Sequence, residues 1–204
     1  MHRPVPWLAC RSTYSLLAGA LEPRDLCRKA REAGQSCIGI ADLGNFYGLV
    51  RFLQSARDQG IKALVAIDFG TVDSDGPLAW LVGQEGYWAL NALVSRLLDA
   101  PATERCSMAA AHFAVHGWAG LVLAVPPHMA PSFSAASRTD LFVALRWGRA
   151  QLPALQAAKQ SGLPLLAVAG GVWTSAPERY RLDLLRAIDR RCTMADLPAH
   201  ERHP

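Results

Sequence analysis

Short apolar segments alternate with amphipathic helical segments along most of the chain, and this alternation is the feature that most limits its possible folds. The predicted strands are 5–10, 37–41, 61–69, 78–82, 121–125, 141–145 and 165–169, and the predicted helices are 23–34, 47–59, 86–98, 151–160 and 177–190. Repeated strand–loop–helix units favour a parallel sheet with right-handed crossovers. The sequence therefore predicts an α/β fold, and both an α/β barrel and an open doubly wound sheet fit the number of elements.

The two halves of the chain are joined by a less regular region, residues 99–140. Residues 99–117 are rich in alanine and are expected to be partly helical, whereas 126–137 is a Pro/Ser-rich segment expected to be a loop. The last residues, 199–204, are expected to form a frayed tail. We expect one domain over residues 1–198.

Helical periodicity also predicts which side chains face the interior. In the segment 47–59, a spacing of three residues places Val50, Leu53 and Ala56 on one stripe, which we expect to point inward. This stripe is a direct test of how far periodicity alone determines packing.

Two of the predicted strands carry an acid close to their C-terminal ends, namely Asp42 and Asp68. In an α/β barrel the functional side chains lie on that face, so these acids favour the barrel over the open sheet. Neither a G-x-G-x-x-G nor a G-x-x-x-x-G-K-[ST] motif occurs, which argues against dinucleotide and P-loop nucleotide sites.

Composition excludes several other classes of protein. Of the 204 residues, 51% are hydrophobic and 19% are charged, enough to bury a sizeable core. The net charge of +4 is too small to predict a nucleic-acid-binding surface. The five cysteines contain no C-x-x-C pair, as in a cytosolic protein with reduced thiols. Without an apolar run long enough to span a membrane, the chain is expected to be soluble and cytoplasmic, with no membrane partner.

Several motifs, taken in order, carry a resemblance to a known family. They lie at residues 10–20, 38–48, 60–69, 85–90, 162–167 and 183–188. Together they resemble a PHP domain (polymerase and histidinol phosphatase), in the version found at the N-terminus of bacterial C-family DNA polymerases such as the DNA polymerase III alpha subunit, of replicative or error-prone type. The resemblance implies a distorted TIM-like (β/α)7 barrel of PHP type.

Active members of this family hold Zn or Mn ions with His, Asp and Glu side chains and hydrolyse phosphoesters. The resemblance places most of those ligand positions on residues that offer no suitable donor. The positions matched to the family's ligands are Ala9, Arg11, Asp42, Leu43, Asp68, Gly170, Val172 and Leu182, with Gly76 matched less securely. Only Asp42 and Asp68 retain a carboxylate, so the resemblance predicts a degenerate site with no metal, no cofactor and no catalytic residue.

The loss of histidine and the gain of Arg11 suggest that an internal ion pair replaces the metal, with Arg11 pairing to Asp42 or Asp68. Cys10 is a conceivable soft metal ligand. His112 and His116, four residues apart, are expected to share a helix face, more often as surface or cap residues than as ligands.

Three functions remain open. The favoured one is a catalytically inactive PHP domain that serves as a scaffold or partner-docking module of a replicase or translesion polymerase. The alternatives are a divergent metal-dependent phosphoesterase and a DNA-contacting module. The arginines that a DNA contact would use are Arg179, Arg181, Arg186, Arg190 and Arg191. Asp183 and Asp189 interrupt them, as on a solvated helix face. Interface candidates are Trp80, Trp88, Trp118, Trp147 and Trp173, although ordinary packing explains each one singly.

Overall fold

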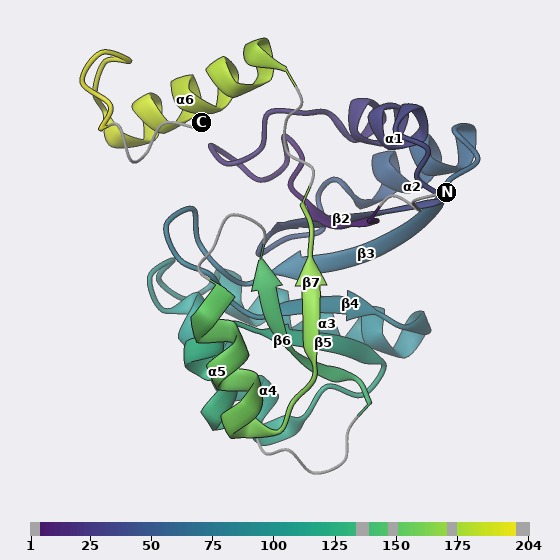
Figure 1. The fold of residues 1–204 in the computed structure, drawn as a ribbon, viewed down its shortest axis with the longest axis vertical. Coiled ribbons are helices and arrows are strands. Elements are labelled where there is room, and N and C mark those ends of the chain that lie inside the picture. Colours follow the sequence, from purple (N-terminus) through teal and green to yellow (C-terminus); the bar gives the residue numbers. More distant parts are fainter. Residues whose placement is uncertain (1–4, 134–138, 147–150, 171–174, 199–204) are drawn as a thin grey trace. The chain divides into compact units, whose positions relative to one another are not determined.

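The chain consists of two compact units in a computed structural model that describes residues 5–133, 139–146, 151–170 and 175–198 (Figure 1). Unit 1 contains residues 1–63 and 170–204, and unit 2 contains residues 64–169. The predicted tail at 199–204, Val172, Trp147 and Trp173 lie outside the described residues.

Unit 1 combines a pair of parallel strands with three helices. Its elements are β1 (Trp7–Cys10), α1 (Pro23–Glu32), β2 (Cys37–Leu43), α2 (Leu49–Asp58) and α6 (Ala176–Arg190). β1 runs parallel to β2, with Trp7 opposite Ile38 and Cys10 opposite Ile40. Helix α1 begins at Pro23, whose missing N–H is not needed in a first helical turn. These elements form close to the predicted positions.

Helix α2 corrects the predicted inward stripe. Phe52 and Ala56 are buried, as expected for Ala56, whereas Val50 and Leu53 are exposed. The buried pair is spaced by four residues and lies on one face, and the large ring of Phe52 determines which face turns inward. The prediction was therefore wrong for Val50 and Leu53, because two overlapping apolar stripes were present and the stripe without the aromatic residue was chosen.

Unit 2 is a mixed sheet covered by helices. It contains the greater part of β3 (Lys62–Asp68), followed by β4 (Leu78–Leu81), α3 (Gly83–Leu98), α4 (Arg105–His116), β5 (Leu121–Val125), the 3₁₀ helix η1 (Pro127–Ser132), β6 (Leu141–Arg146), α5 (Gln151–Ser161) and β7 (Leu165–Val168). The strands β3 to β7 are neighbours in that order, and β4 lies between β3 and β5 (Figure 1). The core includes Ile67, Leu78, Leu123, Leu141 and Val143.

The orientation of β4 corrects the predicted all-parallel sheet. β4 is antiparallel to both β3 and β5, whereas β5, β6 and β7 are parallel. Only residues 69–77 join β3 to β4, and a connection without a helix returns the chain in the opposite direction. The strands themselves are where the sequence places them.

The irregular middle region is more ordered than predicted. The alanine-rich segment contains α4, which confirms its partly helical character. The segment expected to be a loop contains η1 from Pro127 to Ser132, so that prediction was wrong for these residues. A 3₁₀ turn lacks the apolar periodicity that reveals longer helices, and Pro127 is compatible with its first position. Among the described helices, none is long and apolar enough to cross a membrane.

Candidate functional site

Asp42, in unit 1, lies one residue before the end of β2 and is only 3% exposed. Its carboxylate accepts hydrogen bonds from donors of the segment that follows β1. The Ser12 backbone N–H lies 2.7 Å from Oδ1 and the Ser12 hydroxyl 2.8 Å from Oδ2. The Ser15 hydroxyl donates to Oδ1 at 2.6 Å. Neutral donors thus surround this buried charge, and a carboxylate held by several such bonds is well satisfied without a cation.

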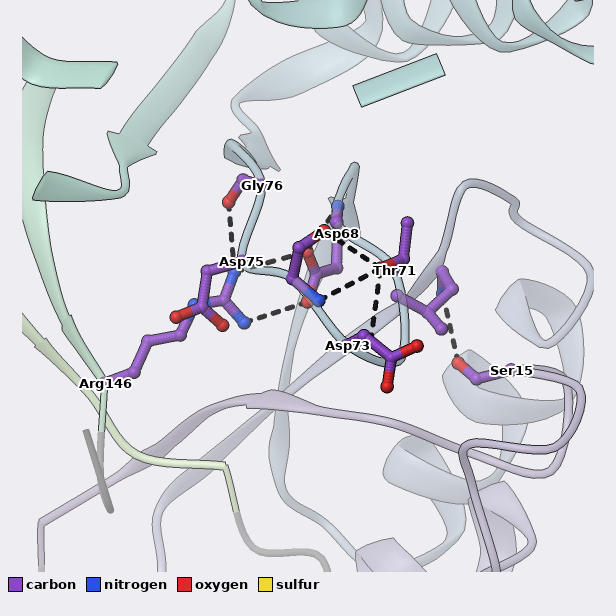
Figure 2. Close-up of polar contacts among 10 residues, drawn as sticks. Ser15, Asp68, Thr71, Asp73, Asp75, Gly76 and Arg146 are labelled. Atoms are coloured by element: carbon purple, nitrogen blue, oxygen red, sulfur yellow. Dashed lines mark hydrogen bonds and ion pairs between the residues drawn. The ribbon is translucent and has the colours of Figure 1, made fainter. Parts of the chain in front are cut away.

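The local turns after β1 place these hydroxyls. The N–H groups of Ala18 and Gly19 both donate to the Ser15 carbonyl, and Ser15 N–H donates to the Ser12 carbonyl. Ser15 Oγ also accepts a bond of 3.0 Å from the N–H of Leu43 (Figure 2). The segment after β1 and the end of β2 are therefore joined through one carboxylate and one hydroxyl.

Asp68, in unit 2, lies at the end of β3 and is 1% exposed. Its main partner is Arg146, the last residue of β6, which Figure 2 shows reaching toward it. Arg146 Nη1 is 2.9 Å from Oδ2 and Nη2 is 3.2 Å from Oδ1, which makes a two-pronged ion pair. The N–H of Gly70 donates to Oδ1 at 2.9 Å.

Arg146 makes two further contacts with the loop between β3 and β4. Nη2 donates to the Gly76 carbonyl at 3.1 Å, and Nε lies 3.6 Å from Asp75 Oδ1 (Figure 2). Burial lowers the pKa of Arg146, but the charges of Asp68 and Asp75 and the hydrogen bonds to Asp68 outweigh it, so the pKa is raised overall. The guanidinium therefore stays charged in the folded protein.

The loop of residues 69–77 has its own hydrogen bonds. Phe69 N–H donates to the Pro77 carbonyl and Thr71 N–H to the Ser74 carbonyl. Thr71 Oγ1 accepts from the N–H groups of Asp73 and Ser74 (Figure 2). A Cβ on Gly76 would come within 2.3 Å of the Gly70 nitrogen, so this position requires glycine. The loop therefore presents Asp75 and the Gly76 carbonyl to Arg146 in a defined conformation.

The structure places the other predicted site residues as follows. Ala9 is in β1, Arg11 follows that strand, Leu43 ends β2, Gly170 follows β7, and Leu182 is buried in α6. None of these side chains except that of Arg11 carries a polar group. The pairing of Arg11 with Asp42 or Asp68 stays a prediction.

The residues considered as substitute ligands are Cys10 in unit 1 and His112 and His116 in unit 2. Cys10 is fully buried in β1. On α4, the rings of His112 and His116 are 4.8 Å apart, and Arg96 Nη2 is 3.4 Å from His112 Nδ1. Burial, then Arg96 and His116, lower the pKa of His112. Within the described ranges, no group of three His, Cys, Asp or Glu side chains is arranged to hold a metal.

The donor atoms at the two acids decide whether a metal centre can form there. Asp42 is occupied by hydroxyl and amide donors, and Asp68 is occupied by a guanidinium. Ala9 and Leu43 have no donor atom in their side chains. The described residues do not fit a multi-metal phosphoesterase centre, which needs several imidazole and carboxylate ligands free to coordinate.

A pocket of about 490 Å³ opens beside Arg146 within unit 2. Its polar lining residues are Asp75, His128, Arg146, Gln156 and Gln160, and the remaining walls come from proline, alanine and leucine. Among the described lining residues, Arg146 is the only arginine or lysine, and it is already paired with Asp68 and Asp75.

Sequence reasoning missed the residues that satisfy the two acids. Arg146 has one available signal, because it directly follows the predicted strand 141–145 and so lies at the same type of position as the two acids. Ser12 and Ser15 lie within the first motif, but their side-chain partners are 30 and 27 residues away in the sequence. Nothing in a single sequence pairs them with Asp42.

Comparison with known proteins identifies the family. A family model described as "PHP domain" matches residues 8–138. An error-prone DNA polymerase of Xanthomonas campestris pv. campestris (strain 8004) is 30% identical, over 96% of this chain and 20% of that protein. The DNA polymerase III subunit alpha of Borreliella burgdorferi is 38% identical over a shorter stretch, which covers 30% of this chain and 5% of that protein. The chain thus spans a fifth or less of the length of these relatives.

A solved structure supports the fold independently. An amidohydrolase from Chromobacterium violaceum superposes with a TM-score of 0.52 at 16% identity, covering 85% of this chain and 88% of that chain. At this identity the likeness concerns the fold alone. With the seven strands and their helices, it confirms the predicted α/β class, a distorted TIM-like (β/α)7 barrel of PHP type. By its family match and by its similarity to the polymerases, the chain belongs to the PHP domain family.

Proposed function

We propose that this chain is a PHP domain without hydrolytic activity that acts as a scaffold or partner-docking module for a C-family DNA polymerase. One observation carries the proposal: the two acids retained at ligand positions, Asp42 and Asp68, are each bonded by the protein's own donors. The proposal includes one domain over residues 1–198 and a place in the cytoplasm beside a replicative or translesion polymerase.

Charge and geometry support the loss of hydrolysis. In metal phosphoesterases the metal activates a water and holds the phosphate oxygens, so several ligands must be free to bind it. Here a metal at Asp68 would have to displace Arg146, and a metal at Asp42 would have to displace the donors of Ser12 and Ser15. Arg11, at another ligand position, adds positive charge, which repels a dication.

Helix α6 supports a docking role with an exposed apolar stripe on unit 1. Tyr180, Leu184 and Ile188 are spaced by four residues and are 60%, 40% and 55% exposed. The opposite face of α6 is anchored, since Lys29 Nζ on α1 lies 2.8 Å from Glu178 Oε1. A stripe of this kind on an anchored helix is typical of a surface that receives another helix.

The charges beside the stripe determine which helix fits. Arg181 and Arg191 are exposed and lie three residues before Leu184 and three after Ile188. In a parallel, in-register pair of α6 helices from two copies, Arg181 and Arg191 would each lie beside the same residue of the other copy. Like charges at these positions oppose that pairing. We therefore propose that the occupant is an amphipathic helix with acidic edges, from the polymerase itself.

Metal content and hydrolysis test the loss of the phosphoesterase. Protein purified without chelator from medium supplemented with Zn²⁺ and Mn²⁺ is expected to hold substoichiometric metal by mass spectrometry. Its hydrolysis of bis-p-nitrophenyl phosphate should equal that of an Asp42→Asn/Asp68→Asn variant. Stoichiometric metal that this double variant loses, together with faster hydrolysis by the wild-type chain, would overturn the proposal.

Binding to a polymerase tests the docking surface. The probe is the Xanthomonas campestris error-prone DNA polymerase lacking the stretch that this chain matches, checked for folding by circular dichroism. Leu184→Asp/Ile188→Asp should weaken binding at least about tenfold. The matched control is Leu152→Asp/Leu155→Asp, which alters two exposed leucines of α5 in unit 2. Failure of the folded probe to bind contradicts docking, and equal binding by both variants contradicts the assignment to α6.

The alternative of a DNA contact through α6 receives less support. Arg186, one of the five arginines it would use, is 8% exposed, and its Nη1 lies 3.4 Å from Asp189 Oδ2. A buried, paired arginine does not contribute to a phosphate-binding surface.

A further inference from the structure

Three oxygen-bearing groups surround the guanidinium of Arg146 in unit 2. They are the carboxylates of Asp68 and Asp75 and the carbonyl of Gly76, at the distances given above (Figure 2). Carboxylate and carbonyl oxygens in combination are the ligands that hard divalent cations prefer. The surroundings of the guanidinium therefore have the composition of a cation site.

The fit between the guanidinium and these groups is incomplete. Among the described residues, the buried Nε of Arg146 finds no hydrogen-bond acceptor, and Asp75 Oδ1 is 3.6 Å from it. A guanidinium has five N–H donors and is best satisfied when all of them find acceptors. Moreover, the carboxylates of Asp68 and Asp75 carry a charge of −2 and the guanidinium of Arg146 carries +1. The guanidinium therefore leaves a charge of −1 that a divalent cation would neutralise.

The oxygen-bearing groups are held in place by contacts that do not involve Arg146. Gly70 N–H donates to Asp68 Oδ1, and Phe69 N–H donates to the Pro77 carbonyl, across the base of the loop. A Cβ on Gly70 would come within 2.5 Å of the Ser74 carbonyl oxygen, so the backbone is closely packed here too. The loop should therefore keep its conformation when the side chain of Arg146 is shortened.

We infer that Arg146 fills an internal cation site whose ligands are Asp68, Asp75 and the Gly76 carbonyl. Shortening its side chain opens that site to one divalent ion. The inference rests on the proposed function in one respect, namely that the wild-type chain holds no metal at Asp68. It goes further by naming the residue that takes the place of the metal and by making the exclusion reversible.

The experiment is a titration with Mn²⁺, followed by electron paramagnetic resonance of the free ion. Arg146→Ala is expected to bind one Mn²⁺ per chain, at least about tenfold more tightly than the wild type. Arg146→Lys is the matched control, because it keeps a positive charge and should exclude Mn²⁺ as the wild type does. Arg146→Ala/Asp68→Asn should lose the binding, since it removes one of the two carboxylate ligands.

The outcomes separate this inference from the proposed function. If folded Arg146→Ala binds no more Mn²⁺ than the wild type, the inference is overturned and the proposed function stands. If the wild type itself binds Mn²⁺ that Asp68→Asn removes, both are overturned. If the Arg146→Ala variant does not fold in the absence of metal, it is denatured and refolded with and without Mn²⁺. If the native circular dichroism spectrum returns only when Mn²⁺ is present, the inference is supported. If the spectrum does not return, the inference is overturned.

Discussion

Both units bury an aspartate at the C-terminal end of a strand, but they stabilise it in different ways. In unit 1, Asp42 accepts bonds from neutral donors, the N–H and hydroxyl of Ser12 and the hydroxyl of Ser15. In unit 2, Asp68 is paired with the guanidinium of Arg146. The first arrangement satisfies the carboxylate with several hydrogen bonds, whereas the second pairs it with an opposite charge.

The two acids also differ in how far along the sequence their partners lie. The donors to Asp42 precede it by 30 and 27 residues, within the first motif, whereas Arg146 follows Asp68 by 78 residues. The Asp42 cluster therefore needs only β1, β2 and the segment between them. The Asp68 cluster is complete only when β6 has joined the sheet. We expect the Asp68 cluster to be the more sensitive to changes in its partner.

The largest expected effect comes from replacing Arg146 with methionine, which keeps most of the side-chain volume but removes the charge. Asp68 would then be a buried carboxylate without its counter-ion, and the free energy of unfolding should fall by about 3–5 kcal/mol. Urea denaturation at pH 7 measures it. Asp68→Asn/Arg146→Met should recover part of the loss, and a loss below about 1 kcal/mol for the single variant would show that the ion pair contributes little.

Substitution of one glycine near each acid compares how tightly the chain is packed around Asp68 and around Asp42. A Cβ on Gly76 would meet backbone atoms of Phe69 and Gly70 at 2.3–2.6 Å, whereas one on Gly48 would meet side-chain atoms of Asp42 and Tyr14 at 2.9 Å. Because backbone yields less than side chains, Gly76→Ala should cost about 3 kcal/mol and Gly48→Ala about 1 kcal/mol. Thermal unfolding of both variants checks the order, and the reverse order would contradict it.

Removal of one hydroxyl tests the neutral cluster. Ser15→Ala deletes the bond to Asp42 Oδ1 and leaves the N–H of Leu43 without this acceptor, at an expected cost of about 1–2 kcal/mol. Ser15→Thr keeps the hydroxyl and serves as the control. If both substitutions cost the same in urea denaturation, the loss reflects packing rather than the hydrogen bond.

The smallest expected effect is a pH dependence that arises at His112, on α4 of unit 2. Since the folded protein holds the pKa of His112 below that of the unfolded chain, the unfolded chain takes up more protons as the pH falls below about 6.5. Stability should therefore decrease on acidification. His112→Gln should reduce the difference between the melting temperatures at pH 7.5 and 5.5 by no more than about 2 °C. An unchanged or larger difference would contradict this.

Much of the local structure follows from the sequence because it depends on short-range patterns. The strand at 121–125 and helix α5, which covers the predicted 151–160, lie where apolar runs and periodicity place them. Helix α6 begins at Ala176, beside the predicted 177, and Ser175 and Glu178 form a capping box there. The acids at positions 42 and 68 are likewise readable, since their place at the strand ends follows from the strands.

Helix α2 shows what hydrophobic periodicity alone does not predict. Ala56 belongs both to the predicted stripe with Val50 and Leu53 and to the stripe with Phe52, and only the stripe with Phe52 is buried. An amphipathic pattern states that one face is buried, but the size and shape of the neighbouring element decide which of two adjacent faces it is.

The sequence by itself determined the α/β class, the order of the elements, the family resemblance and the two acids at strand ends. The tertiary structure alone decided that β4 runs antiparallel, that Ser12 and Ser15 bond to Asp42, and that Arg146 pairs with Asp68. The physical reason is the range of the interactions. Strand and helix propensities act over a few neighbouring residues, whereas a buried carboxylate takes its partner from whichever strand or loop the folded sheet brings beside it.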